Sequence, residues 1–291
     1  MNKMDSAKIC AVTGAGGYVG SCVKNYFERR GWRVLELTRQ PKPGARAAGF
    51  QLGAELSSRV LAGVDALVHC AYDFSPVRWA DIHATNIGGT DKLLRAARDA
   101  AVKKIICIST ISAFEGCRSL YGKAKLEIER LALAEGALVL RPGLVYGEEP
   151  GAMVGKLVEQ VRRSSVLPLV GGSQKQYLVH QEDLCAFIHR YAEGLVPSIA
   201  TPLTAAHEQA RTFREILDAI AAVQGKKLRL VPVPWKLAWL PMKLGELCGM
   251  RLNFRSDSLV SLMHQNPSPD FSRNAALGLA FRLFDPTCLK M

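Results

Sequence analysis

A tyrosine and a lysine four residues apart have the residue types and the spacing for proton transfer. Tyr121 and Lys125 lie in the segment YGKAK, at the start of a helix predicted over Tyr121–Glu135, so they share one helix face. A free tyrosine has a pKa of about 10, and a nearby ammonium lowers that pKa and favours the phenolate. The pair could therefore exchange a proton with a substrate hydroxyl or carbonyl. A surface pair without any function has the same spacing.

Glycines follow the first apolar run of the chain, in the segment TGAGGYVG at residues 13–20. A first glycine permits a tight turn, a second lets the backbone approach a pyrophosphate, and a third lets helix and strand pack closely. The N–H groups that open the following helix favour the same anion. This context predicts a dinucleotide site, although a purely structural turn could carry the same glycines. The predicted contacts are Gly14, Gly17, Tyr18, Val19 and Gly20.

The end of the second predicted strand, Arg33–Thr38, bears on the choice of cofactor. An acid at this point holds the ribose 2′-hydroxyl of NAD, and an arginine accommodates the 2′-phosphate of NADP. The strand tip carries Arg39 and no acid, since Glu36 comes two residues too early. The sequence therefore favours NADP(H) and leaves NAD(H) open. Arg39 could also be a solvated loop charge.

Apolar runs alternate with helix-length segments in the first half of the chain, which is typical of a parallel sheet covered on both faces. Strands are predicted at Lys8–Thr13, Arg33–Thr38, Asp65–Cys70, Lys104–Ser109 and Ala137–Arg141. Helices are predicted at Gly17–Arg30, Thr85–Ala101 and Tyr121–Glu135. Right-handed crossovers then give an α/β fold with a Rossmann-type doubly wound parallel sheet.

Prolines become frequent after Pro142, and the alternation loosens. The predicted division is an NAD(P)-binding domain at residues 1–165, with its sheet completed by 174–192, and a smaller, mostly helical C-terminal substrate lobe at 166–291. One helix of this lobe, Trp235–Cys248, has an apolar stripe with lysines nearby. We expect it to pack on the lobe as a lid, with contact to a membrane surface as the alternative. His69 and His180 lie in apolar patterns and are expected in the core.

Composition excludes several classes of protein. Hydrophobic residues make up 48% and charged residues 22%, and no apolar run reaches the roughly 18 residues of a membrane span. The net charge of +12 is spread without basic runs, which favours anionic small molecules over nucleic acid. No two of the eight cysteines form a CxxC pair, and none is grouped with histidines. This argues against a metal site or a disulfide framework and for a cytoplasmic protein.

Six segments resemble, in this order, the extended or atypical short-chain dehydrogenase/reductases of the NAD-dependent epimerase/dehydratase family. The segments are TGAGGYVG, VDALVHCAY, NIGGT, YGKAK, LRPGLVYG and QYLVHQEDLCAFI, within residues 8–190. The resemblance implies that Ala71, Pro142 and Gly143 lie against the cofactor. It also implies a Ser or Thr beside Tyr121 and Lys125 that hydrogen-bonds the reacting oxygen of the substrate.

The position of this hydroxyl depends on how the family's segment is aligned. Counting from the strand places Thr110 there, with Ser109 and Ser112 as alternatives, and Ser109 is also expected at the cofactor. Counting back from Gly116 places Ile111 there, which cannot hydrogen-bond. The strand is the stiffer reference, so Thr110 is the predicted catalytic hydroxyl.

The resemblance implies an NAD(P)-dependent oxidoreductase that acts on a nucleotide-linked sugar, such as a UDP-sugar of polysaccharide biosynthesis, at C4. Arg39 favours a 4-keto reductase, while a 4-epimerase with tightly bound NAD and a non-catalytic dinucleotide-binding sensor or assembly subunit are the alternatives. Only ten residues separate Thr110 from Tyr121, so the usual substrate-side loop is shortened, and a steroid-type or flavonoid-type ketone stays open. The resemblance also implies a homodimer through the helix that carries Tyr121.

Overall fold

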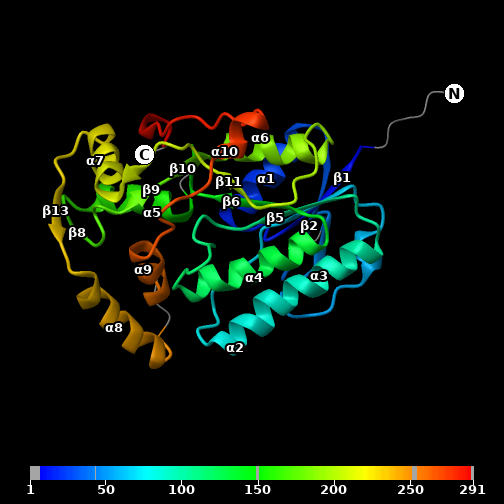
Figure 1. The fold of residues 1–291 in the computed structure, drawn as a ribbon, viewed down its shortest axis with the longest axis horizontal. Helices are drawn as coiled ribbons and strands as arrows, with labels where there is room; N and C mark the ends of the chain where they lie inside the picture. Colours follow the sequence, from blue (N-terminus) through cyan, green and yellow to red (C-terminus); the bar gives the residue numbers. More distant parts are fainter. Residues whose placement is uncertain (1–6, 43, 149–150, 251–253, 290–291) are drawn as a thin grey trace. The chain divides into compact units, whose positions relative to one another are not determined.

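The computed structural model describes residues 7–42, 44–148, 151–250 and 254–289 (Figure 1). Its chain divides into two compact units. The first unit comprises the described residues through Ser109, with Ala124–Leu140 and Leu184–Leu203. The second unit comprises Thr110–Lys123, Arg141–Asp183 and the described residues from Thr204 onward. Each unit therefore takes several separate stretches of the chain, and the division does not coincide with the single boundary predicted near residue 165.

A seven-stranded sheet has the strand order β11-β6-β5-β4-β1-β2-β3. Its strands are β1 (Ile9–Thr13), β2 (Arg33–Thr38), β3 (Ala47–Gly49), β4 (Ala66–His69), β5 (Lys104–Ile108), β6 (Leu138–Pro142) and β11 (Leu203–Ala205). Strands β1 to β6 pair in parallel. The chain proceeds outward from β1 through β2 and β3 on one side and through β4, β5 and β6 on the other. This order confirms the predicted doubly wound α/β fold, and it places a topological switch point between β1 and β4.

Helices cover the sheet because its central strands are apolar over nearly their whole length. All four residues of β4 are buried, as are the last four of β1. Helix α1 (Tyr18–Arg29) packs against α6 (Gln181–Ala192), where the rings of Phe27 and His189 lie 5.2 Å apart. Helices α3 (Gly88–Asp99) and α4 (Leu120–Ala134) lie side by side (Figure 1). Arg98 of α3 forms an ion pair at 3.0 Å with Glu135, the residue directly after α4.

Short elements complete this part of the chain. They are the 3-10 turn η1 (Ser58–Leu61), α2 (Trp79–Ile82) and the π-helical turn η2 (His83–Ile87), which leads directly into α3. Helix α1 ends before Gly31, whose φ of +80° suits glycine at a helix C-terminus. The start of α3 is therefore three residues later than the predicted Thr85, because the π-helical turn precedes it.

The second unit combines helices with three two-stranded sheets. The paired strands are β7 (Leu144–Tyr146) with β10 (Leu178–His180), β9 (Lys175–Gln176) with β12 (Arg211–Thr212), and β8 (Val166–Leu169) with β13 (Arg229–Pro232). The helices are α5 (Ala152–Arg163), α7 (Phe213–Val223), α8 (Trp235–Leu247), α9 (Ser256–Met263) and α10 (Ser272–Ala276), followed by the 3-10 turn η3 (Pro286–Cys288).

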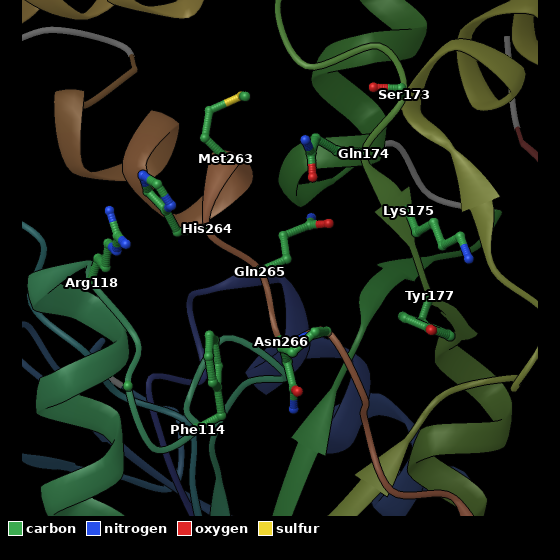
Figure 2. A pocket seen from close by; sticks show the side chains of 12 residues that line it. Phe114, Arg118, Ser173, Gln174, Lys175, Tyr177, Met263, His264, Gln265 and Asn266 are labelled. Atoms are coloured by element: carbon green, nitrogen blue, oxygen red, sulfur yellow. The ribbon is translucent and has the colours of Figure 1, made fainter.

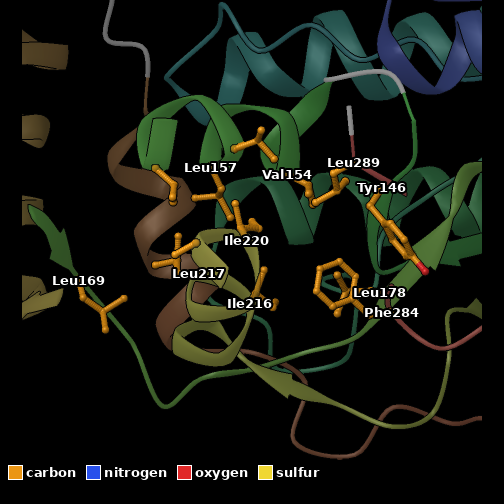
Figure 3. Close-up of a cluster of buried hydrophobic side chains, with 13 residues drawn as sticks. Tyr146, Val154, Leu157, Leu169, Leu178, Ile216, Leu217, Ile220, Phe284 and Leu289 are labelled. Atoms are coloured by element: carbon orange, nitrogen blue, oxygen red, sulfur yellow. The ribbon is translucent and has the colours of Figure 1, made fainter. Parts of the chain in front are cut away.

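An apolar cluster holds the second unit together (Figure 3). Leu157 of α5 and Leu217 and Ile220 of α7 pack with Tyr146 of β7 and with Phe284. Helix α7 begins with a capping box, in which the Thr212 hydroxyl accepts from the Glu215 N–H and the Glu215 carboxylate accepts from the Thr212 N–H. The second unit thus has its own core.

The seventh strand lies later in the chain than the predicted 174–192 segment. Strand β10 in that segment pairs with β7, and β11 at Leu203–Ala205 is the strand that joins the sheet. Strand β7 has no counterpart in the prediction, because LRPGLVYG reads as one extended segment while the structure divides it between β6 and β7. Among the described residues, no helix combines the length and the apolar composition that crossing a membrane requires.

Candidate active site

The glycine loop between β1 and α1 makes a turn that side chains would obstruct. Gly14 has a φ of +66°, and a Cβ there would lie 3.0 Å from the Cα of Ala71. A Cβ on Gly20 would lie 2.2 Å from the Gly14 carbonyl oxygen, whereas a Cβ on Gly16 would meet nothing within 4 Å. Gly14 and Gly20 are therefore required by backbone packing, and open space lies over the middle of the loop.

The N-terminus of α1 is suited to an anion. Gly17 is the N-cap, and the first turn contains Tyr18, Val19 and Gly20 and no acidic residue. The first N–H groups of a helix have no helical acceptor, and the helix dipole favours negative charge at this end. The loop and the helix start thus fit the pyrophosphate of a dinucleotide, whose contacts with these residues stay predictions.

A buried hydrogen-bond chain fixes the ends of β1 and β4 beside this loop. The Thr13 hydroxyl accepts from the N–H groups of Cys70 and Ala71, both at 3.1 Å, so its own proton is donated to His69 Nδ1 at 2.7 Å. His69 Nε2 therefore carries a hydrogen, which it donates to Thr90 Oγ1 at 3.0 Å. Burial lowers the pKa of His69 to about 3, and the charge of Lys125 adds to the shift, so the ring is neutral. His69 is a core histidine, as predicted. The hydrogen-bond chain of which it is part holds the backbone of Ala71 in place.

The Lys125 ammonium is buried, with 3% of the residue exposed. Its Nζ donates to the Ile108 carbonyl oxygen at 2.8 Å and lies 5.2 Å from the centroid of the Tyr72 ring. Burial lowers the pKa of Lys125, while the neighbouring thiols of Cys107 and Cys70 oppose that change. The cation is thus held at the carboxyl end of β5 by a carbonyl and an aromatic face.

The three candidate hydroxyls have different partners. Thr110 hydrogen-bonds Tyr121 through the side chains, and its Oγ1 also accepts from the Ser112 N–H at 3.2 Å. Ser109 is buried and donates to Glu129 Oε1 at 2.5 Å, so its hydroxyl is engaged within the fold. The geometry therefore favours Thr110 over Ser109 as the hydroxyl that acts with Tyr121, and it leaves the Ser109 side chain turned toward α4.

The pKa of Tyr121 differs from the sequence-based expectation. Burial raises the pKa of Tyr121 to about 12, and the hydrogen bond from Thr110 only partly opposes this. The expected lowering by Lys125 is not found, because the ammonium is directed to the Ile108 carbonyl. The pKa of Tyr121 is therefore raised, and not lowered as the spacing of Tyr121 and Lys125 suggested.

Asp257 is a positioning residue that the sequence analysis did not identify. Its Oδ1 accepts from the Leu120 N–H at 2.8 Å and its Oδ2 from the Tyr121 N–H at 2.9 Å. The carboxylate belongs to α9 and caps the first turn of α4, where negative charge is favoured by the helix dipole. No local motif could have revealed this cap, because 136 residues separate Asp257 from Tyr121.

Two glycines near the pair are fixed by close packing. A Cβ on Gly122 would lie 2.6 Å from the Ser112 carbonyl oxygen, and a Cβ on Gly143 would lie 2.1 Å from the Tyr177 carbonyl oxygen. The carbonyl of Pro142 accepts from the Ile111 N–H at 3.0 Å. Pro142, at the end of β6, and Gly143, directly after it, thus contact the segments of Ile111 and Tyr177. Their contact with a cofactor stays a prediction.

A pocket of about 440 Å³ lies within the second unit (Figure 2). Figure 2 shows Arg118 and His264 toward one side of it and Lys175 on the other. None of the twelve lining residues that the structure describes is acidic, so the pocket favours an anion. Phe114, Gly116 and Arg118 come from the shortened loop between Thr110 and Tyr121. The full lining is Phe114, Gly116, Arg118, Ser173, Gln174, Lys175, Tyr177, Met263, His264, Gln265, Asn266 and Pro267.

Arg39 follows the last residue of β2 and is exposed. Glu36, the nearest acid in the strand, pairs with Lys24 of α1 at 2.5 Å. Its carboxylate is therefore engaged and lies two residues before the strand tip. Among the described residues, no group of three His, Cys, Asp or Glu side chains could hold a metal ion.

Replacing Asp257 with alanine removes the cap of α4. We expect Asp257→Ala to lower the free energy of unfolding by about 1–2 kcal/mol and also to lower kcat, because Tyr121 loses its fixed N–H partner. Asp270→Ala is the matched control, since Asp270 accepts from the Ser272 N–H at 2.9 Å at the start of α10. Urea unfolding and turnover measure both effects. Equal turnover in the two variants would contradict a positioning role for Asp257.

The neutral state of His69 predicts a pH dependence of stability. The unfolded chain takes up a proton below pH 6.5, but folded His69 does so only near pH 3, so the free energy of unfolding falls as the pH drops between these values. We expect His69→Asn to reduce this slope by one proton, or about 1.4 kcal/mol per pH unit. His83→Asn, at a side chain that is 54% exposed, is the control. Parallel slopes for wild type and His69→Asn in urea unfolding would refute the account.

Comparisons with known proteins agree with this geometry. Residues 10–200 match the NAD dependent epimerase/dehydratase family. The chain is 28% identical to ceramide reductase of Caulobacter vibrioides over 244 residues, covering 79% of this chain and 75% of the relative. It is 27% identical over 266 residues to the 4-hydroxy-2-methyl-3-oxo-4-farnesyl-3,4-dihydroquinoline-1-oxide ketoreductase of Stigmatella aurantiaca, covering 81% of this chain and 79% of the relative.

Among solved structures, the fold is similar to UDP-glucose 4-epimerase of Thermotoga maritima in complex with UDP-glucose. The TM-score is 0.75 at 19% identity, and the match covers 96% of both chains. The family match spans most of the chain and confirms the resemblance seen in the six sequence segments. The chain therefore belongs to the NAD-dependent epimerase/dehydratase family and is an enzyme of the short-chain dehydrogenase/reductase type.

Proposed function

We propose that this enzyme reduces a ketone to an alcohol with NADPH. The observation that carries the proposal is the hydrogen bond between Thr110 and Tyr121 at the start of α4, with Lys125 one turn further along the same helix. A bound nicotinamide would supply the hydride to the carbonyl carbon. The glycine loop and the start of α1 would hold the pyrophosphate of that cofactor, and Ala71, Pro142 and Gly143 are its other proposed neighbours.

The side chains of this site have separate tasks in the proposal. The Tyr121 phenol donates its proton to the carbonyl oxygen as negative charge develops there. Thr110 orients the same oxygen and hydrogen-bonds the phenolate that results. Lys125 lies one turn further along α4, where its ammonium donates to the Ile108 carbonyl oxygen. In the proposal, another N–H of this ammonium binds a ribose hydroxyl of the cofactor.

Reduction is favoured over epimerisation by the exposed Arg39 at the end of β2, which suits the 2′-phosphate of NADPH. A reductase consumes NADPH at each turnover, whereas a 4-epimerase keeps its NAD bound. Both relatives named above are also reductases by name, which supports the same direction. A 4-epimerase with tightly bound NAD is the alternative.

For the substrate we propose a nucleotide-linked sugar with a ketone at C4, such as a UDP-4-keto sugar. The support is the pocket of the second unit, which carries Arg118, Lys175 and His264 without any lining carboxylate. A diphosphate would match this charge, and the rings of Phe114 and Tyr177 offer apolar surface to a base or sugar. The pocket lies mainly in the C-terminal lobe to which we assign substrate binding.

A large apolar ketone is the second candidate substrate. The names of the two curated relatives favour it, since ceramide and a farnesyl dihydroquinoline are both largely hydrocarbon. We further propose a cytoplasmic enzyme, because all eight cysteines are free thiols and a reducing compartment keeps them so. Homodimer formation through α4 stays a proposal.

Replacement of Tyr121 tests the reaction itself. We expect Tyr121→Phe to lower kcat for a UDP-4-keto sugar about 10²–10⁴-fold, with NADPH binding unchanged, because only the proton donor is lost. Tyr177→Phe is the control, since this tyrosine lines the pocket but donates no proton in the proposed reaction. Turnover is followed by NADPH absorbance and product mass. Reduction of a long-chain ketone alone would select the second substrate class, and no turnover with either ketone would favour a non-catalytic sensor.

Replacement of Arg39 tests the cofactor. We expect Arg39→Ala to weaken NADPH binding about tenfold and to leave NADH binding unchanged, because only NADPH carries the 2′-phosphate. Arg33→Ala, at the opposite end of β2, is the control. Titrations of the purified protein measure both affinities. Retention of one NAD per chain after purification, with no effect of Arg39→Ala, would contradict the NADPH assignment and support an epimerase.

A further inference from the structure

Helix α8 of the second unit has an outward face made of apolar side chains. Leu237 is 69% exposed, and Leu240 and Leu244 are each 54% exposed. These residues recur every three or four positions, so they lie along one side of the helix. Pro241 and Cys248 are exposed at the same spacing. The face therefore offers a continuous apolar strip, unlike the isolated exposed leucines that most surfaces carry.

The opposite face of α8 contacts α9 and the residue that follows it. The Trp235 ring lies 6.4 Å from the Trp239 ring and 6.0 Å from the His264 ring, measured between centroids. Glu246 is buried and accepts from the Ser256 N–H at 2.7 Å and from the Ser256 hydroxyl at 2.6 Å. These contacts fix the rotation of α8 and keep its leucines outward.

The sequence around the strip carries mainly positive charge. Residues 226–250 contain five basic residues and a single acid, Glu246. The Glu246 side chain is only 6% exposed and lies 4.0 Å from Arg255, so it presents little charge outward. Lys236 is exposed on α8 itself, next to Leu237. The chain as a whole carries a net charge of +12. A partner that complements this surface therefore combines an apolar region with negative charge.

We infer that α8 docks on an anionic lipid bilayer, lying in the interface with Leu237, Leu240 and Leu244 inserted among the acyl chains. A helix with an apolar strip flanked by basic residues binds such surfaces by apolar burial and by attraction to anionic headgroups. The inference is independent of the proposed reaction. The sequence analysis expected α8 to act as a lid and gave contact with a membrane surface as the alternative. We adopt that alternative here.

A second copy of the chain fits the strip less well. Three leucines cover much less than the roughly 800 Å² per partner that a stable protein interface buries. An anionic bilayer does not have this limit, because it is extended, and its charge is opposite to the net charge of the chain.

Vesicle flotation with the full-length protein tests the inference. We expect the protein to float with phosphatidylcholine vesicles that contain about one third phosphatidylglycerol, and to bind pure phosphatidylcholine at least about tenfold more weakly. High salt should weaken the binding, because headgroup attraction is screened. No flotation with the anionic vesicles at low salt would overturn the inference.

Paired variants locate the contact. Leu237→Glu is expected to weaken vesicle binding at least about tenfold, since it places a charge in the apolar interface. Leu195→Glu is the matched control, because Leu195 is also 69% exposed but follows α6 in the first unit. Lys236→Gln should weaken binding about fivefold, and Lys103→Gln, at an exposed lysine before β5, should not.

Two results would contradict the docking site. An equal loss of vesicle binding in Leu237→Glu and Leu195→Glu would mean that general charge, rather than α8, controls the association. A concentration-dependent dimer that Leu237→Glu dissociates would assign the strip to a second copy. Unchanged thermal midpoints in all four variants show that the differences arise from binding and not from unfolding, as expected for exposed positions.

Discussion

The ammonium of Lys125 is buried at the carboxyl end of β5, and the orientation of α4 depends on how that charge is satisfied. A buried cation without partners is very costly, and here a main-chain carbonyl and the face of Tyr72 receive it. The hydrogen bond from Lys125 to the Ile108 carbonyl therefore ties α4 to the end of β5. Tyr121 lies one turn earlier on the same helix.

The first turn of α4 depends on the C-terminal part of the chain. Asp257 of α9 accepts from the first N–H groups of α4, and the preceding Ser256 is held by Glu246 of α8. Residues far apart in sequence therefore set the position of Tyr121. The same Glu246 anchors the helix whose leucines face outward, so one set of contacts serves the candidate catalytic helix and the proposed membrane strip.

Local patterns predicted much of the fold. Strands β1, β2, β4, β5 and β6 lie where apolar runs occur, because central strands of a parallel sheet are buried on both faces. The glycines of the first loop were predicted from the same logic, and their crowding explains why Gly14 and Gly20 cannot carry a side chain. Helix α4 was placed within one residue of its start.

Long-range contacts could not be predicted from local sequence patterns. The Asp257 cap, the partner of Ser109 and the pairing of β10 with β7 all join residues whose spacing carries no periodic signal. The raised pKa of Tyr121 was also missed, because spacing placed Lys125 on the right helix face but could not show that its ammonium donates to Ile108. Exposure of the α8 leucines likewise depends on which face of the helix is packed.

Isotope transfer tests the central claim most directly. NADPH with deuterium at both C4 positions of the nicotinamide would be incubated with the enzyme and a UDP-4-keto sugar or a long-chain ketone, and the product analysed by mass spectrometry. The account predicts one deuterium at the former carbonyl carbon for each NADPH consumed. Conversion of an added UDP-sugar into its C4 epimer, with no change of mass and no consumption of cofactor, would contradict the reductase assignment. Consumption of neither ketone, with the cofactor bound, would contradict catalysis by Tyr121.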